Sequence, residues 1–316
     1  MHPTPDIYYD VTAALSLGQR DQQEDAVVSD FPVGAGMGFA VLADGMGGHA
    51  AGDVASKIVV TEVFSELKMQ AGDPAVLEDR IATILRDAAI SANDCVRLHS
   101  QTNPETAGMG ATLVAPVLFG NRLYWISVGD SPLYLFRRGV LSRLNEDHSM
   151  TTQIDYLVNS GMVEADWGDN HPDRNCLTSV LIGDDIARID CPVRPLELHE
   201  GDIVIVASDG LQFLEEEEIA ELIESNLNRT STEISAELMR SLAELNDPDQ
   251  DNVSLCVIRV TSDPLLGRQP VPHAAAAIAE STARQVRGKS GGITVMARRS
   301  NSKKVMTYRL SMEKSA

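Results

Sequence analysis

The sequence predicts an α+β domain built on antiparallel sheets, and two patterns in the chain support this fold class. Strand-like apolar runs follow one another with short turns between them, for example at Asn121 and at Asp130-Ser131. Such short links join antiparallel neighbours, because a parallel crossover needs about a dozen residues. Other segments place apolar residues at three- and four-residue spacing, which is typical of amphipathic helices.

The predicted elements alternate along the first five-sixths of the chain. Helices are expected at about 53–70 and 74–99, where the apolar spacing is clearest, and again at about 215–227 and 232–246. The acidic run Glu215–Glu218 opens the third of these, where carboxylates suit the positive end of the helix dipole. Apolar runs bounded by turn residues predict strands in VTAALSLG, GFAVLAD, ATLVAPVLF, RLYWISVGD, PLYLFRRG, DIVIVASD and NVSLCVIRV.

Composition and charge exclude several classes of protein. The chain has 316 residues, of which 43% are hydrophobic and 23% charged, as in soluble globular proteins. No run reaches the roughly 18 apolar residues of a membrane span, and the start MHPTPDIYYD lacks the features of a secretory leader. A net charge of −20 argues against binding of nucleic acid. Since no CxxC pair occurs among Cys95, Cys176, Cys191 and Cys256, we expect free thiols and a cytoplasmic location.

Charge and composition change together near the C-terminal end. Residues 1–264 hold 16 Lys and Arg against 44 Asp and Glu, a balance of −28, whereas residues 265–316 hold 10 against 2, a balance of +8. We therefore expect a folded domain at 1–262, a Pro-rich linker at 263–273 and a basic extension at 274–316. The extension is predicted either to be disordered or to form a short helix and a hairpin that binds the acidic domain or an acidic partner.

Acidic residues stand at the ends of several predicted strands. Three of these strands run directly into an aspartate, a fourth is preceded by one, and two more acids follow the first strand: Asp44, Asp130, Asp209, Asp251, Glu24 and Asp25. An acid after one strand and an acid before its antiparallel neighbour lie at the same sheet edge, so these carboxylates can converge. Taken singly, each acid is explained more simply as a residue of a turn that follows a strand. Together they would need cations, and a set of oxygen ligands selects Mg²⁺ or Mn²⁺.

Short motifs along residues 10–262 carry a resemblance to a known family. In order, they are RDQQEDA (20–26), ADGMGGHAAGDVAS (43–56), GATL (110–113), VGDSPLY (128–134), DHS (147–149), LTSVLIG (177–183), VASDGL (206–211) and DNVS (251–254). This series resembles the metal-dependent protein phosphatases of type 2C, and DGMGG resembles their bacterial branch. The resemblance implies a four-layer α/β/β/α sandwich of two antiparallel sheets, with a binuclear metal centre at one sheet edge. It also implies hydrolysis of phosphoserine and phosphothreonine in proteins, opposing a serine/threonine kinase.

The resemblance also implies a set of ligands for Mn²⁺ or Mg²⁺: Glu24, Asp25, Asp44, Gly45, Asp130, Asp209 and Asp251. Asp44 would bridge two ions, Asp209 and Asp251 would complete the first site, and Asp25 with the Gly45 carbonyl would serve the second. Glu24 would assist Asp25, and Asp130 would help to hold a weaker third ion. A hydroxide that bridges the two ions would then attack phosphorus in line.

Outside the metal ligands, one residue keeps the pattern of the family and three positions depart from it. Arg20 matches the residue that binds the substrate phosphate, for which a planar bidentate donor is suited. Eukaryotic relatives place a histidine directly after the Asp-Gly pair, where this chain has Met46, so His49 is the nearest candidate for protonating the leaving group. Pro132 and Ser179 stand where arginines are common. A catalytically weak or silent member that acts as a binding module is therefore the alternative hypothesis.

Overall fold

The computed structural model describes residues 7–32, 36–47, 50–164, 166–167, 171–174 and 176–263. The first of its two large sheets has the strand order β1-β12-β11-β8-β9, and every neighbouring pair is antiparallel. These strands are Tyr8–Ser16, Val253–Thr261, Ile203–Ala207, Leu133–Arg137 and Val140–Arg143, in the order of the sheet.

The second sheet is also antiparallel, with the order β10-β7-β6-β3-β2. Its strands are Leu196–Glu197, Arg122–Val128, Leu113–Phe119, Met37–Ala43 and Ala26–Asp30, in that order. A separate two-stranded ribbon pairs β4 (Gly45–Met46) with β5 (Gly110–Ala111). This ribbon continues the chain directly beyond Asp44, at the edge where the acidic residues were expected.

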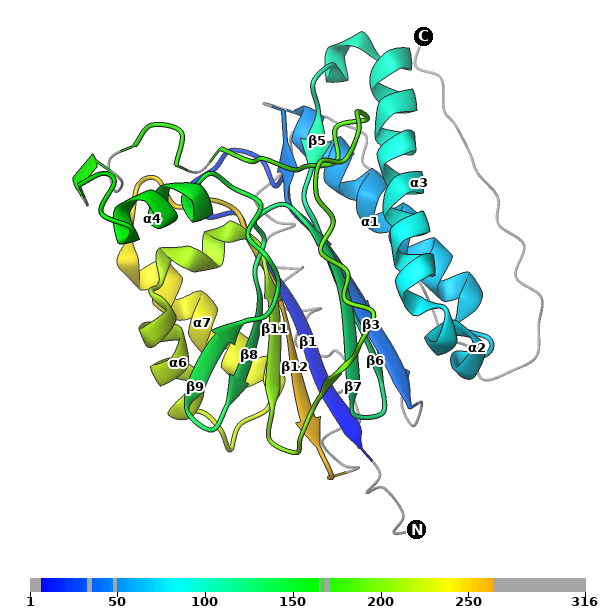
Figure 1. The fold of residues 1–316 in the computed structure, drawn as a ribbon. Coiled ribbons are helices and arrows are strands. Elements are labelled where there is room, and N and C mark those ends of the chain that lie inside the picture. The colour runs from blue at the N-terminus through cyan, green and yellow to red at the C-terminus, as the bar shows by residue number, and fades with distance from the viewer. Residues whose placement is uncertain are drawn as a thin grey trace, which may run out of the picture. The chain divides into compact units, whose positions relative to one another are not determined.

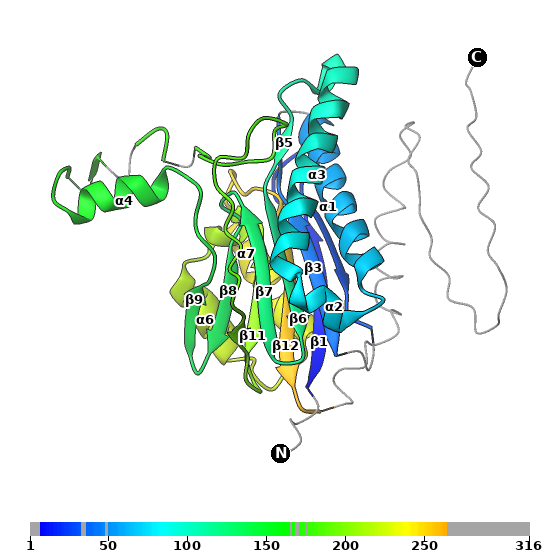
Figure 2. The same ribbon diagram turned by 45° about the vertical axis from the view of Figure 1, so that its right-hand side comes forward.

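Helices cover the outer face of each sheet (Figure 1). The second sheet carries α1 (Ala50–Gln70), α2 (Pro74–Asp79) and α3 (Ile81–Thr102), and the first carries α6 (Glu216–Glu224) and α7 (Ser231–Leu245). Short 3₁₀ helices, η1 (Pro104–Thr106) and η2 (Asp209–Phe213), follow α3 and β11, and α4 (Thr151–Asn159) lies outside the layers (Figure 2). The predicted α/β/β/α sandwich is therefore confirmed.

Three apolar clusters correspond to the three interfaces between the four layers. The period-two pattern of the strands divides their residues between clusters. In β6, Leu113 and Val117 face the cluster under α1 and α3, whereas Val114 and Leu118 face the cluster between the two sheets. In β12, Leu255 and Val257 belong to the cluster under α6 and α7, whereas Cys256 and Ile258 lie between the sheets. Burial on both faces makes these strands apolar throughout.

The hairpin expected at Asp130-Ser131 is wrong, because β7 and β8 lie in different sheets. The side chain of Asn145 binds two backbone groups of the segment that links the two strands. Its Oδ1 accepts from Leu133 N at 2.8 Å and its Nδ2 donates to Ser131 O at 3.0 Å. The link can therefore carry the chain from one sheet to the other without leaving buried backbone groups unpaired.

The predicted helix at 74–99 is two helices, α2 and α3, separated at Arg80. This residue leaves the helical conformation, with φ −115° and ψ 9°. The other three predicted helices are confirmed within a few residues, whereas α4, β2, β4, β9 and β10 were not predicted. No helix in the described part of the chain is both long and apolar enough to cross a membrane. Residues from Pro264 onward lie outside the described residues, so the linker and the extension stay predictions.

Candidate active site

The ends of strands from both sheets meet around one open pocket of about 600 Å³. Asp44 follows β3, Asp130 follows β7, Asp209 follows β11, and Asp251 precedes β12. These carboxylates line the pocket together with residues from the neighbouring loops: Arg20, Glu24, Gly45, Met46, Gly47, Thr112, Cys176, Leu177, Val180 and Asn252. The structure thus brings the strand-end acids to one place, as their positions in the sequence require.

The carboxylates influence one another electrostatically. Burial raises the pKa of Asp130 to about 7, and the charge of Asp209 adds to this increase. The pKa of Asp44 lies well above its ordinary value because of burial first and then the charges of its acidic neighbours, led by Asp25. Burial and the charge of Asp251 likewise raise the pKa of Asp209. Such a cluster holds its full negative charge at neutral pH only when cations compensate it.

Asp25 is buried and does not line the pocket directly. Ser208, which precedes Asp209, donates from Oγ to Asp25 Oδ2 at 2.7 Å. Burial raises the pKa of Asp25 to about 6, and the hydrogen bond from Ser208 opposes this increase. The charges of Asp209 and Asp251 raise it further, so Asp25 belongs electrostatically to the same cluster.

Hydrogen bonds between loops hold the edge of the pocket in place. Asn252 Oδ1 accepts from Glu24 N at 2.7 Å, which ties the loop after β1 to the start of β12. Thr112 Oγ1 accepts from Asp44 N at 2.9 Å, and Thr112 N donates to Asp44 O at 2.8 Å. The motifs DNVS and GATL contain both positioning residues, so this signal was present in the sequence although neither residue was singled out.

Gly45 and Gly52 permit the first turn of α1 to approach the loops of the site closely. A Cβ on Gly45 would lie 2.1 Å from Gly52 O and 2.6 Å from Glu24 O, and a Cβ on Gly52 would lie 2.8 Å from both Gly45 O and Glu24 Oε2. Only glycine fits at either position while the surrounding backbone stays in place. The Gly45 carbonyl and the Glu24 carboxylate therefore lie next to each other, although the sequence analysis did not single out Gly52.

Arg20 is the basic residue among the described residues that line the pocket. Its guanidinium donates from Nη2 to Asp251 Oδ2 at 2.6 Å, and more than half of its side chain is exposed. Pro132 and Ser179, which replace arginines of the family pattern, do not line the pocket. Ser179 is buried, and its Oγ donates to Arg188 O at 2.8 Å. The role of Ser179 is thus to hold a loop.

The donor set fits hard divalent cations. Asp209 Oδ1 is buried and has no hydrogen-bond partner in the described structure. A buried acceptor of this kind is available to bind a cation. In the described residues, no three His, Cys, Asp or Glu side chains are already arranged as a metal cluster. Arg20 and Ser208 each donate to one carboxylate oxygen of the set, so Asp251 and Asp25 retain lone pairs that could bind an ion.

His49 lies outside the described residues, and the structure therefore does not place it. Met46, which occupies the position of the eukaryotic histidine, lines the pocket and is 40% exposed. Cys176, Leu177 and Val180 form a further wall that the sequence analysis did not connect with the site. These residues add apolar and thiol side chains to a lining that is otherwise mainly acidic.

The sequence matches the protein phosphatase 2C family over residues 18–245, a range that contains most strands of both sheets and most of the pocket. The chain belongs to this family. The resemblance of the sequence motifs to type 2C phosphatases is thereby confirmed. For this phosphatase 2C protein, the converging carboxylates occupy the region that the family match covers, except for Asp251, which lies just beyond it.

Bacterial serine/threonine phosphatases are similar to this phosphatase 2C protein. It is 33% identical over 214 residues to the phosphatase PstP of Mycobacterium tuberculosis, covering 65% of this chain but only 38% of that relative. It is 33% identical over 186 residues to the phosphatase stp of Listeria monocytogenes, covering 58% of this chain and 71% of the relative. A solved PstP catalytic domain in complex with two manganese ions has a TM-score of 0.63 and 28% identity, covering 81% of this chain and 99% of that one.

Proposed function

We propose that this protein hydrolyses phosphoserine and phosphothreonine in proteins and requires two divalent ions, Mn²⁺ or Mg²⁺. The observation that supports this best is the pocket in which strand-end carboxylates from both sheets face one exposed guanidinium. The solved PstP domain, which holds two manganese ions, is consistent with this metal requirement. When bound, the ions would supply an activated water and would neutralise the charge of the phosphate.

In this proposal the acidic residues and one backbone carbonyl hold the ions, and an arginine binds the substrate. Asp44, Asp209 and Asp251 would hold one ion, and Asp44 would share the second with Asp25, Glu24 and the Gly45 carbonyl. Asp130 with Asp209 would hold a third, weaker ion. Arg20 would bind the substrate phosphate through two parallel N–H donors, which match the spacing of phosphate oxygens. His49 remains our candidate for protonating the leaving group.

Hydrolysis of p-nitrophenyl phosphate and of a phosphothreonine peptide tests the proposal. Purified protein is assayed with Mn²⁺, with Mg²⁺ and with EDTA, and we expect turnover with metal only. Asp209→Asn removes one ligand charge at nearly constant volume, so we expect loss of at least about 100-fold in kcat with an unchanged circular dichroism spectrum. Near-normal turnover by this variant would contradict the metal assignment.

The alternative of a silent binding module predicts a different result from the same assay. Folded protein that shows no turnover with any metal would favour it, because binding a phosphoprotein requires no hydrolysis. The buried and unpartnered Asp209 Oδ1 argues for the enzyme, since a pure binding module gains nothing from an unsatisfied carboxylate.

We further propose that the substrates are phosphoproteins of a cytoplasmic kinase. All four cysteines are free thiols in the structure, which supports a reducing compartment. Binding of the basic extension at 274–316 to the acidic domain or to an acidic partner also stays a proposal. It rests on the opposite charges of the two parts of the sequence.

A further inference from the structure

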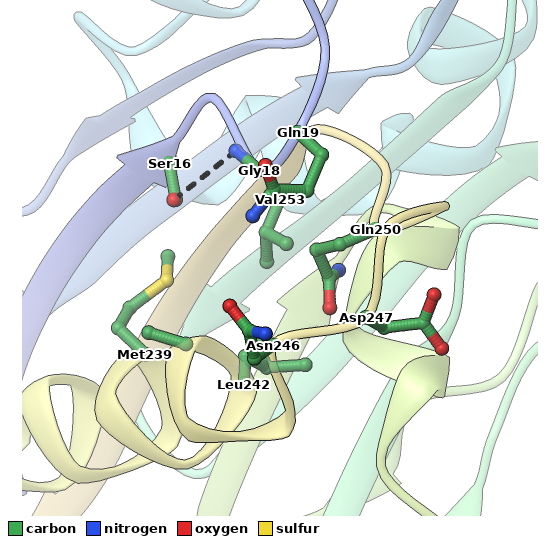
Figure 3. A pocket seen from close by; sticks show the side chains of 10 residues that line it. Ser16, Gly18, Gln19, Met239, Leu242, Asn246, Asp247, Gln250 and Val253 are labelled. Atoms are coloured by element: carbon green, nitrogen blue, oxygen red, sulfur yellow. Dashed lines mark hydrogen bonds between the residues drawn. The ribbon is translucent and has the colours of Figure 1, made fainter.

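A second pocket lies beside the loops of the active site and is separate from the catalytic pocket. It has a volume of about 110 Å³ and is formed by the end of α7, the loop after β1 and the start of β12 (Figure 3). Gly18, Gln19 and Gln250 line it, whereas their chain neighbours Arg20 and Asp251 line the catalytic pocket. The two short loops therefore present one side to each pocket.

Gln250 has an unsatisfied oxygen at this pocket. The residue is only 5% exposed, and its Oε1 is buried without a hydrogen-bond partner among the described residues. Its Nε2 donates to the carbonyl oxygen of Gly210 at 3.2 Å, which fixes which end of the carboxamide is the nitrogen. Figure 3 shows the oxygen on the side of Asn246, at the end of α7. A buried carbonyl oxygen of this kind is costly unless a donor reaches it.

The rest of the lining combines acceptor groups with an apolar surface. Side-chain oxygens come from Ser16, Asn246 and Asp247. Figure 3 shows Asn246 beside Gln250, Ser16 across the pocket beside Gly18, and the carboxylate of Asp247 at the rim, directed away from the other side chains. Met239, Leu242 and Val253 supply the apolar surface. No Lys or Arg lines the pocket in the described structure. An occupant should therefore carry several N–H donors, a positive charge and an apolar face.

We propose that this pocket binds a guanidinium group. A guanidinium has five N–H donors in one plane and two weakly hydrated faces, so its edge can bind the oxygens while a face contacts Leu242 and Val253. An ammonium ion is more strongly hydrated and has no such face. The volume fits a group of about four to six non-hydrogen atoms, since a cavity of about 150 Å³ binds benzene. The source is either a free small guanidinium compound or an arginine side chain.

Occupation of this pocket would act on the metal loops through Gln250. The backbone oxygen of Gln250 accepts from Gln19 N at 2.9 Å, next to Arg20. Its side chain binds the carbonyl oxygen of Gly210, next to Asp209, and Asp251 follows it in the chain. A guanidinium that binds Oε1 would thus immobilise the residue that links these three loops. We expect it to lower the Mn²⁺ concentration that gives half-maximal turnover.

Binding can be measured without activity, by ¹H–¹⁵N NMR of the full chain in EDTA. Methylguanidinium is titrated as the free compound, and acetyl-arginine amide as the model of a side chain, at constant ionic strength. We expect saturable shifts of the Gln250 side-chain amide and of the Gly18 and Asn246 signals. Saturation by methylguanidinium alone would identify a free compound as the occupant, whereas saturation by acetyl-arginine amide would show that an arginine side chain can enter.

Variants separate this site from general attraction to an acidic surface. Asp247→Asn keeps the shape and removes the negative charge at the rim of the pocket, and we expect its Kd for methylguanidinium to rise about tenfold because the attraction between the two charges is lost. Asn246→Gly suits the left-handed backbone at this position, φ 48°, and removes the carboxamide without strain. Asp249→Asn is the matched control, since it changes the same charge two residues away and outside the pocket.

Two results would overturn the proposal and leave a pocket filled by water. One is the absence of saturable shifts, and the other is an equal affinity of Asp247→Asn, Asp249→Asn and the unmodified chain. Because the titration is done in EDTA, its outcome does not depend on whether the protein is a phosphatase. If methylguanidinium binds but the Mn²⁺ dependence of turnover stays unchanged, the binding site is supported and the coupling through Gln250 is overturned.

Discussion

At the scale of single residues, the contact between Arg20 and Asp251 bears on the proposal that Arg20 binds the substrate phosphate. The pair is 2.6 Å apart and largely exposed on the arginine side. Exposed ion pairs contribute only about 0–1 kcal/mol, so under this proposal a doubly charged phosphate would readily replace Asp251 as the partner of Arg20. The released carboxylate oxygen would then be a further possible ligand for an ion, and substrate binding would be linked to metal binding through one side chain.

Replacing Arg20 should therefore weaken substrate binding more than it slows the chemical step. For Arg20→Gln we expect KM for a phosphothreonine peptide to rise about 10- to 100-fold with kcat changed much less, because charged hydrogen bonds contribute about 1.5–3 kcal/mol. Steady-state kinetics with saturating Mn²⁺ measure both constants. Arg80→Gln makes the same charge change at the junction of α2 and α3 and should leave KM unaltered. An unchanged KM in Arg20→Gln would remove this residue from the substrate site.

At the scale of elements, the site depends on how closely α1 approaches the loops at the sheet edge. This helix begins at Ala50, and Gly52 in its first turn touches the Gly45 carbonyl and the Glu24 carboxylate. The α1 packing against the second sheet thus places a backbone oxygen and a carboxylate side by side. A helix with any side chain at this position would have to shift outward.

Gly52→Ala should disturb the ion site although alanine favours helices. Alanine in a helix is about 1 kcal/mol more favourable than glycine, but its Cβ would lie 2.8 Å from the Gly45 oxygen. We expect the Mn²⁺ concentration for half-maximal turnover to rise at least about tenfold, since misplaced ligands bind ions less well. Metal titrations of activity measure this shift. Gly72→Ala, where a Cβ meets nothing within 4 Å, is the control, and equal titration curves for both variants would contradict the role of Gly52.

At the scale of the whole molecule, strand ends from two sheets concentrate negative charge at one edge. The protein as a whole is also strongly acidic, with a net charge of −20. Without cations the folded state therefore holds several carboxylates in an unfavourable environment. The fold tolerates this arrangement because its three apolar clusters stabilise it elsewhere.

The stability of the metal-free protein should fall as pH rises from 5 to 8. Burial raises the pKa of Asp25 to about 6 and that of Asp130 to about 7, whereas the same groups titrate near pH 4 in the unfolded chain. The folded state binds more protons across this interval, so the free energy of unfolding decreases with rising pH. Burial lowers the pKa of His148, so this residue alone would make the free energy of unfolding increase with rising pH. The effect of this one group is opposed by that of several carboxylates.

Thermal unfolding in EDTA at several pH values measures this dependence. We expect the midpoint temperature to decrease toward pH 8 and Mn²⁺ to restore it. Asp130→Asn should flatten the dependence, because the amide does not titrate. A midpoint that rises steadily from pH 5 to 8 without metal would show that the carboxylates are not clustered in solution.

Removing residues 264–316 should leave a folded and active protein. Both five-stranded sheets are complete at Thr261, and the residues that line the catalytic pocket all precede it. We expect the truncated chain to match the full chain in unfolding temperature and in turnover of p-nitrophenyl phosphate. Loss of more than about 2 °C, which for a domain of this size corresponds to about 1 kcal/mol, would show that the extension stabilises the domain. Changed turnover of protein substrates alone would assign it a role in recognition.

Much of the architecture could be predicted from the sequence, because local patterns record it. Apolar runs and amphipathic spacing predicted most strands and three of the helices, since the period of a pattern depends only on the local backbone. The position of acids at strand ends predicted that Asp209 and Asp251 would converge, because β11 and β12 are antiparallel neighbours. The motifs predicted the family, which the comparison over residues 18–245 confirms.

The tertiary structure alone decided the features that depend on residues far apart in the chain. The strand β8 pairs with β11 and β9 and not with β7, and Asn145 pairs backbone groups of the link between β7 and β8. The orientation of Ser179 toward Arg188 and the contact of Gly52 with Gly45 likewise depend on packing. The pocket at Gln250 exists only because the end of α7 lies beside two loops from opposite ends of the chain. Sequence patterns report which backbone conformation a segment prefers, whereas the partners of a buried polar group are determined only when the layers pack.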